Sequence, residues 1–476
     1  MGAHPDTQAL ENPTREAIRQ LIVRARAAQR AHERCSQEQV DEIVTACGWA
    51  IIKPDNNRRL AEQAVKDTGL GNVADKITKN ERKTLGLLRD LRGAKTVGVI
   101  AEHPETGITE IARPVGVVAA VTPSTNPGAT PANKIINALK CRNSIIVAPS
   151  PKGWSTCALL LEFVRAELAK VGAPADLVQM LAAPVTKEAT VELMRQADLV
   201  VATGSQANVR AARTSGTPAI GVGVGNVAVI IDASADLADA AHKIALSKCF
   251  DNATSCSSEN SVIVISAVYE QALAELAKAG GALLSADEKS KLKSAMWPGG
   301  KLNPDVMARP VADIVKAAGL SRPALANARF LMVEETGTGS EHPFSGEKLS
   351  LVLTLYRVPD FDAAFDQVRS IYGYQGAGHS VGIHSRNEAQ ILRLGLEMQA
   401  CRVIVNQAHA IANGGAFDNG LPFSLSMGCG TWGRNSISEN LHYRHYLNIT
   451  RIVRTIPGRI PSLEEIFGAY HSRYGR

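Results

Sequence analysis

Short apolar segments alternate with helix-like segments through the middle of this 476-residue chain, and this alternation most constrains its fold. Three apolar segments read as buried strands: "SIIVAPS" (144–150), "LVQMLAA" (177–183) and "LVVATGS" (199–205). Helical periodicity follows each of them, over 155–170, from 187 and from 206. Short strands separated by helices predict a mostly parallel sheet with right-handed crossovers, which in outline is a dinucleotide-binding architecture.

In the segments before this region, apolar residues repeat at other intervals. Residues 14–95 carry apolar side chains at intervals of three and four and are expected to form helices, with Ser36 as one N-cap. From residue 96 the pattern alternates, turns at Pro104–Gly107 and alternates back, which predicts a hairpin. An isolated hairpin has nothing to bury its face against, so we expect it to pair with the β-rich tail and to contact another subunit.

The strand pattern resumes after residue 245, so we predict an α/β protein of two α/β domains with a small β element for oligomerisation. The predicted parts are a first, nucleotide-binding domain (1–95 and 116–244), a catalytic domain (245–435), and a hairpin with a C-terminal tail (96–115 and 436–476). No G-x-G-x-x-G sequence opens a helix. The sequence "GVGVG" at 221–225 leads into a strand, so we do not interpret it as a phosphate-binding loop.

Composition excludes several classes of function. The net charge of +6 is small, and no long Lys/Arg run is present, so no nucleic-acid partner is expected. Neither a signal peptide nor a span of ~20 apolar residues is visible, which predicts a cytoplasmic protein without a membrane segment. Eight scattered cysteines without a C-x-x-C pair indicate reduced thiols and no metal site. His442 and His445, three residues apart, are interpreted as structural.

Two residues suggest covalent chemistry. Cys256 lies in the polar loop "FDNATSCSSEN", where a structural cysteine would not normally be found. Asn126 follows a strand end in "VTPSTNP" and could supply an amide donor to an oxyanion hole beside a nucleophile. Taken alone, Asn126 is more typical of a turn residue than of an oxyanion-hole donor.

The chain resembles the aldehyde dehydrogenase superfamily, in particular its coenzyme A-acylating branch. The resemblance covers nearly the whole chain, in the family's order, and is closest to the acylating succinate-semialdehyde and sulfoacetaldehyde dehydrogenases. The matching motifs are "ARPVGVVAAVTPSTNP", "ATGS", "GVGVGN", "NATSCSSENSVIV", "PFSGEKLS", "GAGHSVGIHS", "RVIVNQ", "GCGTWGRNSISEN" and "NITRIVRTIPGRIPSLEEIFG".

The resemblance implies roles for individual residues. Cys256 matches the nucleophile, Asn126 the oxyanion-hole amide, and His379 a histidine that assists proton transfer, although a structural role for His379 is also open. Ser205 opens the helix expected at the cofactor pyrophosphate, and Glu347 matches the glutamate that holds the nicotinamide ribose. The complete set of expected cofactor-binding residues is Thr122, Pro123, Ser150, Lys152, Gly204, Ser205, Gly223 and Glu347.

One departure from the hydrolytic branch of the family is informative. Where those enzymes carry the glutamate that activates water, this chain has Gly221. Losing a general base removes ~10²–10⁴-fold in rate, so the thiol of coenzyme A is the expected acyl acceptor. The alternatives are a hydrolytic aldehyde dehydrogenase and a non-catalytic cargo protein of a compartment. By resemblance we also expect a homodimer or homotetramer.

Cofactor and substrate are less constrained by the sequence. No carboxylate follows the strand "SIIVAP", whereas Lys152 lies close behind it, so we expect NADP, with NAD as the alternative. A small anionic aldehyde would require a guanidinium near the thiol, for which Arg434 and Arg402 are the candidates. Resemblance favours sulfoacetaldehyde first and succinate semialdehyde second.

Overall fold

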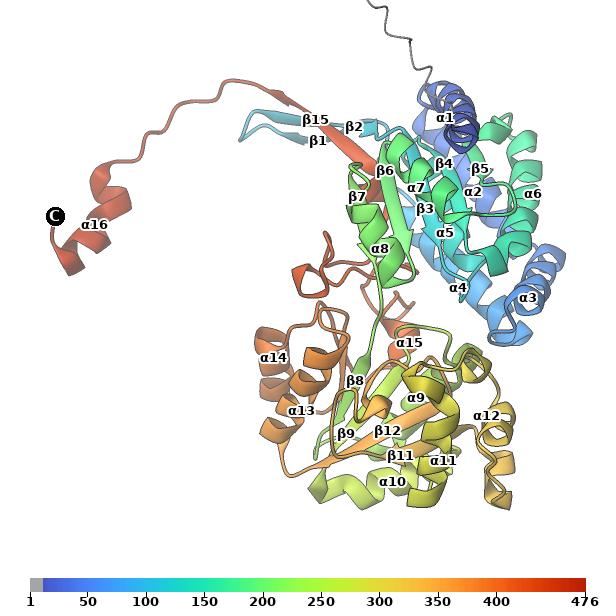
Figure 1. The fold of residues 1–476 in the computed structure, drawn as a ribbon. Coiled ribbons are helices and arrows are strands. Elements are labelled where there is room, and N and C mark those ends of the chain that lie inside the picture. Colours follow the sequence, from blue (N-terminus) through green and yellow to red (C-terminus); the bar gives the residue numbers. More distant parts are fainter. Residues whose placement is uncertain (1–11) are drawn as a thin grey trace, which may run out of the picture.

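The computed structural model describes residues 12–476, which form two α/β lobes and a projecting β element (Figure 1). The first lobe contains a five-stranded sheet in the order β5-β4-β3-β6-β7, in which all pairs are parallel. Its strands are β3 (Val117–Thr122), β4 (Ser144–Pro149), β5 (Val178–Met180), β6 (Leu199–Thr203) and β7 (Ala219–Val222).

Helices cover both faces of this sheet, because its central strands are apolar on both sides. The N-terminal helices are α1 (Pro13–His32), α2 (Gln37–Ile52), α3 (Pro54–Thr68) and α4 (Val73–Leu91). The helices between and after the strands are α5 (Ala129–Lys140), α6 (Trp154–Lys170), α7 (Lys187–Gln196) and α8 (Gln206–Arg213). The predicted parallel sheet with N-terminal helices is confirmed.

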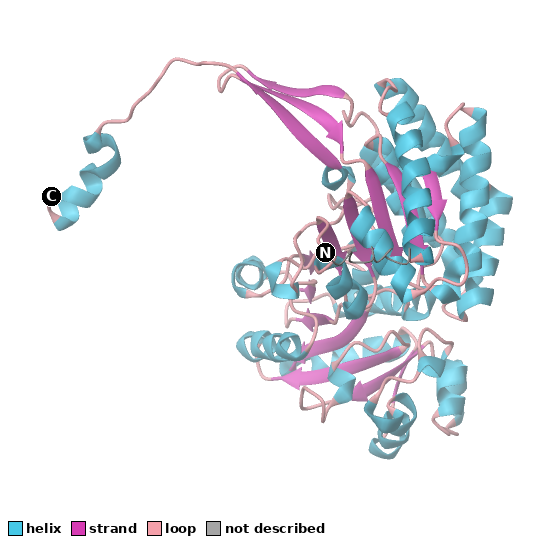
Figure 2. Ribbon diagram, turned by 45° about the horizontal axis from the view of Figure 1, so that its top comes forward, coloured by secondary structure: helices cyan, strands magenta, loops and turns pink. Residues whose placement is uncertain are grey.

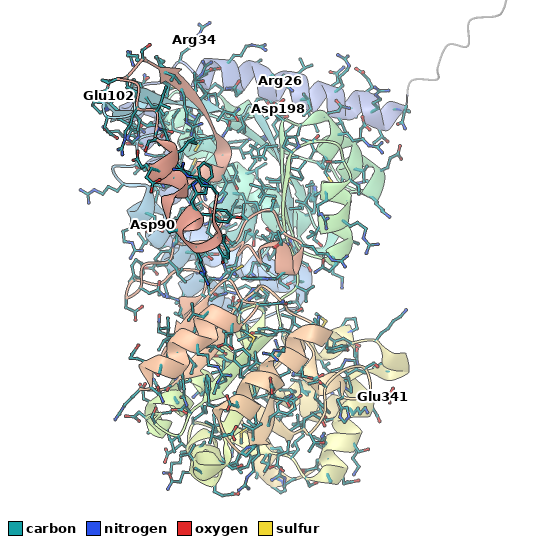
Figure 3. All side chains as sticks on the ribbon, turned by 90° about the vertical axis from the view of Figure 1, so that its left-hand side faces the viewer. Arg26, Arg34, Asp90, Glu102, Asp198 and Glu341 are labelled. Atoms are coloured by element: carbon teal, nitrogen blue, oxygen red, sulfur yellow. The ribbon has the colours of Figure 1, made fainter. Side chains whose placement is uncertain are left out.

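Two local features fix the N-terminal helices. Ser36 is the N-cap of α2, with a capping box formed with Gln39, as its sequence position predicts. Arg26 on α1 makes a bidentate pair with Asp198, at 2.8 and 2.9 Å (Figure 3). The Asp198 carboxylate also accepts from the Val117 N–H, so it joins α1 to the start of β3.

The second lobe contains a seven-stranded parallel sheet in the order β10-β11-β12-β9-β8-β13-β14. Its strands are β8 (Val227–Ile231), β9 (Glu259–Ile265), β10 (Gly281–Leu283), β11 (Phe330–Glu334), β12 (Val352–Val358), β13 (Val381–His384) and β14 (Val403–Val405). Its helices are α9 (Leu237–Cys249), α10 (Tyr269–Lys278), α11 (Ala286–Met296), α12 (Val311–Ala317), α13 (Phe361–Tyr374), α14 (Glu388–Glu397) and α15 (His409–Ala412).

The chain passes between the two sheets earlier than the expected boundary at residue 244. β8 pairs with β9 and β13, so residues 227–244 belong to the second lobe. The apolar run "PAIGVGVGNVAVIID" reads as one stretch in the sequence, but it holds the last strand of one sheet and a central strand of the other.

The third sheet projects from the first lobe. β1 (Gly98–His103) and β2 (Ile108–Pro114) form the predicted hairpin, and β15 (Leu447–Val453) pairs antiparallel with β2. Beyond β15 the chain extends away from both lobes to α16 (Leu463–Tyr474) (Figure 2). Over residues 12–476, no helix combines the length and the apolar character that a membrane span requires.

Candidate active site

A cavity of about 930 Å³ is lined by residues of both lobes. The first lobe contributes the carboxyl ends of β3, β4 and β6 together with α7 and α8, and the second lobe contributes the segments 254–256 and 347–349. Ligands of open parallel sheets bind beyond the carboxyl ends of the strands, so this is where the topology places a binding site.

Cys256 lines this cavity from the loop between α9 and β9. Just before it, Asp251, Asn252 and Ala253 adopt left-handed backbone conformations with φ of 51°, 51° and 60°. Each such residue with a Cβ costs ~1–2 kcal/mol, so the loop must be held by its surroundings.

The Asp251 carboxylate provides that restraint. It accepts hydrogen bonds from Lys76 Nζ at 3.1 Å, from Thr254 Oγ1 at 2.8 Å and from the backbone N–H of Asn72 at 3.0 Å. It also accepts a short bond from Lys79 Nζ. The N-terminal half of α4 therefore anchors the loop that carries the nucleophile.

The Cys256 thiol is protonated at neutral pH in the free protein. Its pKa is raised to about 12, first by burial and then by the charge of Glu347, which Ser257 and Arg402 offset only in part. Because the thiolate is the nucleophilic form, this site requires a base that takes the proton during attack.

His379 is placed to be that base. Its Nε2 atom lies 3.4 Å from Cys256 Sγ, and burial together with the Arg402 charge lowers the pKa of His379 to about 3. His379 Nδ1 lies 2.8 Å from Ser380 Oγ, which lies 2.9 Å from His409 Nε2. A proton on Nδ1 donated to Ser380, whose hydroxyl in turn donates to His409, leaves Nε2 as an acceptor that faces the thiol.

The two candidate substrate arginines lie elsewhere. Arg402 is buried and donates to the carbonyl oxygens of His379 at 2.6 Å and Gly428 at 2.7 Å, so it holds the backbone of the base. Arg434 is exposed, with a left-handed φ of 56°. Neither side chain is among those that line the cavity.

Asn126 lines the same end of the cavity as Cys256. Its Oδ1 atom accepts from Lys79 Nζ at 2.8 Å, and Lys79 also donates to Thr254 Oγ1 at 3.0 Å and to Asp251. Because an ammonium can only donate, Lys79 fixes the orientation of the amide and leaves Asn126 Nδ2 free to donate to an oxyanion.

Glu347 is the one acidic residue of the described chain that lines the cavity. Burial raises the pKa of its carboxyl to about 8, while a hydrogen bond from the Gly225 N–H opposes the rise. The side chain is therefore largely protonated at neutral pH and can donate to, as well as accept from, a bound hydroxyl group.

Most of the expected cofactor residues of the first lobe come together around the same cavity. Thr122, Pro123, Gly204, Ser205 and Gly223 all line it. The Ser205 side chain is the N-cap of α8, whose first turn also faces the cavity, so free N–H groups are available to a pyrophosphate. Thr122 Oγ1 is buried without a hydrogen-bond partner among residues 12–476.

The basic groups near the end of β4 differ in position. Ser150 lines the cavity, whereas Lys152 is exposed in the short turn Pro151–Gly153 and lies outside the lining. Lys187, at the start of α7, and Arg210, within α8, do line it. Among the cavity-lining residues of the described chain, Lys187 and Arg210 are therefore the two cations available to a phosphate.

Gly221 lies within β7, where a Cβ would meet Val209 Cγ1 at 2.8 Å, and it does not line the cavity. The glycine of this motif nearest the thiol is Gly225, where a Cβ would lie 2.5 Å from the Cys256 carbonyl oxygen and 3.2 Å from His379 Nε2. The close approach of His379 to Cys256 therefore depends on a residue without a side chain at position 225.

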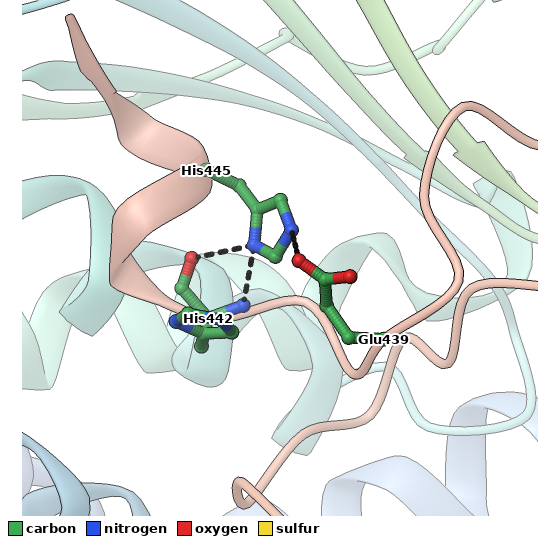
Figure 4. Close-up of side chains that lie close together, drawn as sticks. All are labelled: Glu439, His442 and His445. Atoms are coloured by element: carbon green, nitrogen blue, oxygen red, sulfur yellow. Dashed lines mark hydrogen bonds and ion pairs between the residues drawn. The ribbon is translucent and has the colours of Figure 1, made fainter. Parts of the chain in front are cut away.

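His442 and His445 lie away from the cavity, close to Glu439 (Figure 4). His445 Nε2 pairs with Glu439 Oε1 at 3.0 Å, and its Nδ1 atom lies 3.1 Å from the backbone N–H of His442. Both ring nitrogens of His445 thus have partners within the protein, which is consistent with a structural role for this side chain.

Sequence reasoning missed several groups that build this site. Lys79 reads in the sequence as an ordinary charge on a helix, and only the tertiary structure places it against Asn126. The contact of His379 with Ser380 and His409 was also not predicted, although Ser380 directly follows His379 within "GHS". Lys187 and Arg210 carry no distinguishing signal, because cations on helices are common on protein surfaces.

Comparisons with known proteins agree with this geometry. The sequence profile described as the aldehyde dehydrogenase family matches residues 7–295. A sulfoacetaldehyde dehydrogenase (acylating) of Cupriavidus necator is 63% identical over 461 residues, covering 97% of this chain and 94% of that protein. A succinate-semialdehyde dehydrogenase (acetylating) of Clostridium kluyveri is 40% identical over 455 residues, covering 95% and 99%.

Among solved structures, an acetylating aldehyde dehydrogenase from Geobacillus thermoglucosidasius is similar with a TM-score of 0.90 and 36% identity, covering 94% of this chain and 98% of that one. A propionaldehyde dehydrogenase of a Clostridium phytofermentans microcompartment matches with a TM-score of 0.81 and 25% identity, covering 93% and 98%. From its profile match, its relatives and its fold, the chain belongs to the aldehyde dehydrogenase family.

Proposed function

We propose that this protein oxidises sulfoacetaldehyde and transfers the acyl group to coenzyme A, forming sulfoacetyl-CoA. The observation that carries the proposal is the pairing of Cys256 with the neutral imidazole of His379, beside the oriented amide of Asn126. The relative that is 63% identical supports both the acylating reaction and this aldehyde. Acylating oxidation of succinate semialdehyde is the second candidate, because a relative 40% identical carries that name.

In the first half of the reaction, Cys256 Sγ attacks the aldehyde carbon while His379 Nε2 takes the thiol proton. The resulting oxyanion accepts from Asn126 Nδ2 and from the Cys256 N–H, which supplies the electrostatic stabilisation on which acyl chemistry depends. A bound NADP or NAD supplies a nicotinamide that accepts the hydride. The acyl group is then held as a thioester on Cys256.

Before the second half, His379 releases the first proton to solvent. The thiol of coenzyme A then attacks the thioester while His379 accepts its proton, and the same proton passes to the Cys256 thiolate as the acyl-CoA is released. The sum is aldehyde, coenzyme A and oxidised cofactor in, and acyl-CoA, reduced cofactor and one proton out. Exchange between two thioesters is close to neutral in free energy, so the reaction runs in both directions. The resemblance aligns Gly221 with the glutamate that activates water in the hydrolytic branch, and this replacement favours coenzyme A over water as the acceptor, although Gly221 itself lies in β7 outside the cavity lining.

NADP is the proposed preferred cofactor, with NAD as the alternative. Two cations, Lys187 and Arg210, line the cavity, and Lys152 lies just beyond Ser150. Among residues 12–476, Glu347 is the only acidic residue that lines the cavity; it is in the other lobe beside Cys256, so no carboxylate of this part of the chain is placed to repel a 2′-phosphate.

We further propose a homodimer or homotetramer assembled through the projecting sheet and the tail. The tail carries exposed apolar side chains both before and within α16, with Ile460 96%, Leu463 73% and Tyr470 60% exposed. Such a surface is typical of a chain segment that packs on a second subunit. A cytoplasmic location is proposed because all eight cysteines are free thiols.

The test of the proposed function is a panel of aldehydes assayed with coenzyme A and either nicotinamide, followed by absorbance of the reduced cofactor. We expect turnover that requires coenzyme A, is highest with sulfoacetaldehyde and yields an acyl-CoA. Equal rates without coenzyme A, with free acid as product, would favour a hydrolytic dehydrogenase. Absence of turnover under every condition would favour a non-catalytic cargo protein.

A further inference from the structure

A second, smaller cavity adjoins the catalytic end of the large one. It holds about 30 Å³, and Ser255 and Ser257, the neighbours of the nucleophile in the chain, both line it. The two cavities have four lining residues in common: Asn126, Ser255, Leu425 and Met427. The smaller cavity has about twice the ~10–15 Å³ that one water requires, so it can accommodate one compact group attached to a substrate whose carbonyl lies at Cys256.

One wall of this small cavity is a basic face of α4. Lys79, Arg82 and Lys83 all line it, and their spacing of three and four residues places them side by side on the helix. No Asp or Glu of the described chain lines the small cavity. The electrostatic character of the space is therefore positive, next to the reacting thiol.

The two lysines of this face are committed to protein partners. Lys79 uses three hydrogen bonds, to Asn126, Asp251 and Thr254. Lys83 Nζ donates to the Gly414 carbonyl at 2.6 Å, and burial lowers the pKa of Lys83 to about 7, so it carries only part of a charge at neutral pH.

Arg82 differs from both lysines. Within residues 12–476 its guanidinium has neither an ion pair nor a hydrogen bond, although the side chain is half-buried. Burial lowers the pKa of Arg82 and the Asp418 charge raises it, yet a guanidinium keeps its proton at any ordinary pH. Five donors in a planar fork therefore face the cavity without an acceptor.

We infer that Arg82 binds the anionic group of the substrate, a sulfonate or carboxylate on a short aldehyde, in the small cavity beside Cys256. A guanidinium fork matches the oxygens of such a group in two-point geometry, which a lysine cannot reproduce. Arg82 lines the smaller cavity and not the large one, which contains the residues proposed to bind the nicotinamide cofactor. The inference rests on the proposed function and identifies the residue that selects its substrate.

The experiment compares kcat/KM for sulfoacetaldehyde, succinate semialdehyde and neutral propionaldehyde, in the full-length wild type and in Arg82→Gln. We expect the ratio of kcat/KM for sulfoacetaldehyde to that for propionaldehyde to fall about 100-fold in Arg82→Gln, because a partly buried charge pair is lost. Arg82→Lys retains the charge but lacks the planar guanidinium, so its selectivity ratio should lie between those of the wild type and Arg82→Gln. The carboxylate substrate shows whether sulfonate or carboxylate is preferred.

Arg58→Gln is the matched control, since it removes the same charge from an exposed position of α3, where Arg58 pairs with Asp55. A selectivity ratio within tenfold of wild type in Arg82→Gln would overturn the assignment of Arg82. A wild type that already prefers propionaldehyde would instead overturn the proposed substrate. Inhibition by 2-hydroxyethanesulfonate, the alcohol analogue without a reactive carbonyl, gives an independent reading, and its inhibition constant should rise by the same factor as the ratio falls.

Discussion

Cys256 Sγ and His379 Nε2 lie 3.4 Å apart although 123 residues separate them in the chain. The thiol has a pKa raised to about 12 and the imidazole one lowered to about 3, each chiefly by burial. Both groups are therefore neutral at physiological pH, and the proton moves between them only when the substrate is attacked. The activity of the site depends on this neutral pair, and not on a preformed thiolate.

Replacing His379 with Ala should lower kcat/KM for the aldehyde ~10²–10⁴-fold, since it removes the general base. The wild-type profile of kcat/KM should show no ionisation near pH 6.5, because the His379 pKa lies far below that value. His242→Ala, at an exposed position of α9, serves as the control. An inflection near pH 6.5 that disappears in His379→Ala would show that the imidazole is charged in the free enzyme and would refute the neutral pair.

Lys79→Met should lower kcat by ~10²–10³, because Asn126 loses the partner that orients its amide toward the oxyanion. Lys76→Met is a matched control, since Lys76 also donates to Asp251 but does not contact Asn126. Steady-state kinetics and cofactor binding should show that affinity for NADP is retained in both variants. Equal losses of kcat in the two would mean that Lys79 acts only by holding the loop.

Glu347→Gln should lower the pKa of the Cys256 thiol, since the Glu347 charge raises it. Alkylation by iodoacetamide as a function of pH measures this directly. The same variant tests stability. The folded-state pKa of Glu347, about 8, lies above the ordinary 4.5, so its contribution to stability is present below about pH 4.5 and is lost as pH rises to 8.

Wild type should therefore lose more unfolding free energy than Glu347→Gln between pH 5 and pH 9 in urea titrations. Parallel curves for the two proteins would show that the buried carboxyl does not titrate as described. An unchanged alkylation profile would show that Glu347 does not influence the thiol.

Arg210→Ala should raise the KM for NADP about tenfold or more relative to the KM for NAD, because only NADP carries the 2′-phosphate. Lys152→Ala provides the comparison, since Lys152 is exposed and lies outside the cavity lining. An effect of the substitution on coenzyme A binding would change both KM values alike and would therefore cancel in their ratio. A change confined to Lys152→Ala would assign the phosphate to the turn after β4.

Removing residues 457–476 should reduce the assembly to a smaller species. Each large apolar side chain that a subunit contact buries contributes roughly 1.5–3 kcal/mol, and Ile460, Leu463 and Ile466 are all exposed in the single chain. Sedimentation velocity at several protein concentrations measures the mass, with Leu463→Ser as a milder version. An unchanged mass in both variants would place the subunit contact elsewhere.

The sequence predicted the parts of this protein that depend on local pattern. Alternation of strands and helices gave the parallel sheet of the first lobe, and the period change at residue 96 gave the hairpin. The pairing of β15 with β2 was also predicted, because an unpaired hairpin needs a neighbour. The role of Cys256 could also be predicted from its neighbours, because a buried structural cysteine would not normally be surrounded by Ser and Asn.

Other features depend on tertiary contacts that leave no periodic signal. Helix α5 has buried residues on all sides, including Lys134, whose Nζ donates to the carbonyls of Val121 at 2.7 Å and Val201 at 2.9 Å. An apolar stripe was therefore absent from its sequence. Lys79 and Arg82 look alike in the sequence, and only their contacts show that one orients an amide while the other has no protein partner in the described chain.

The most direct test of the account is to mix the enzyme with sulfoacetaldehyde and NADP in the absence of coenzyme A and to measure the mass of the peptide that contains Cys256. We predict one sulfoacetyl group on Cys256, formed together with one equivalent of NADPH. Addition of coenzyme A should then release sulfoacetyl-CoA and restore the free thiol. Release of free sulfoacetate before coenzyme A is added, or NADPH formation by Cys256→Ala, would contradict a thioester that waits for coenzyme A.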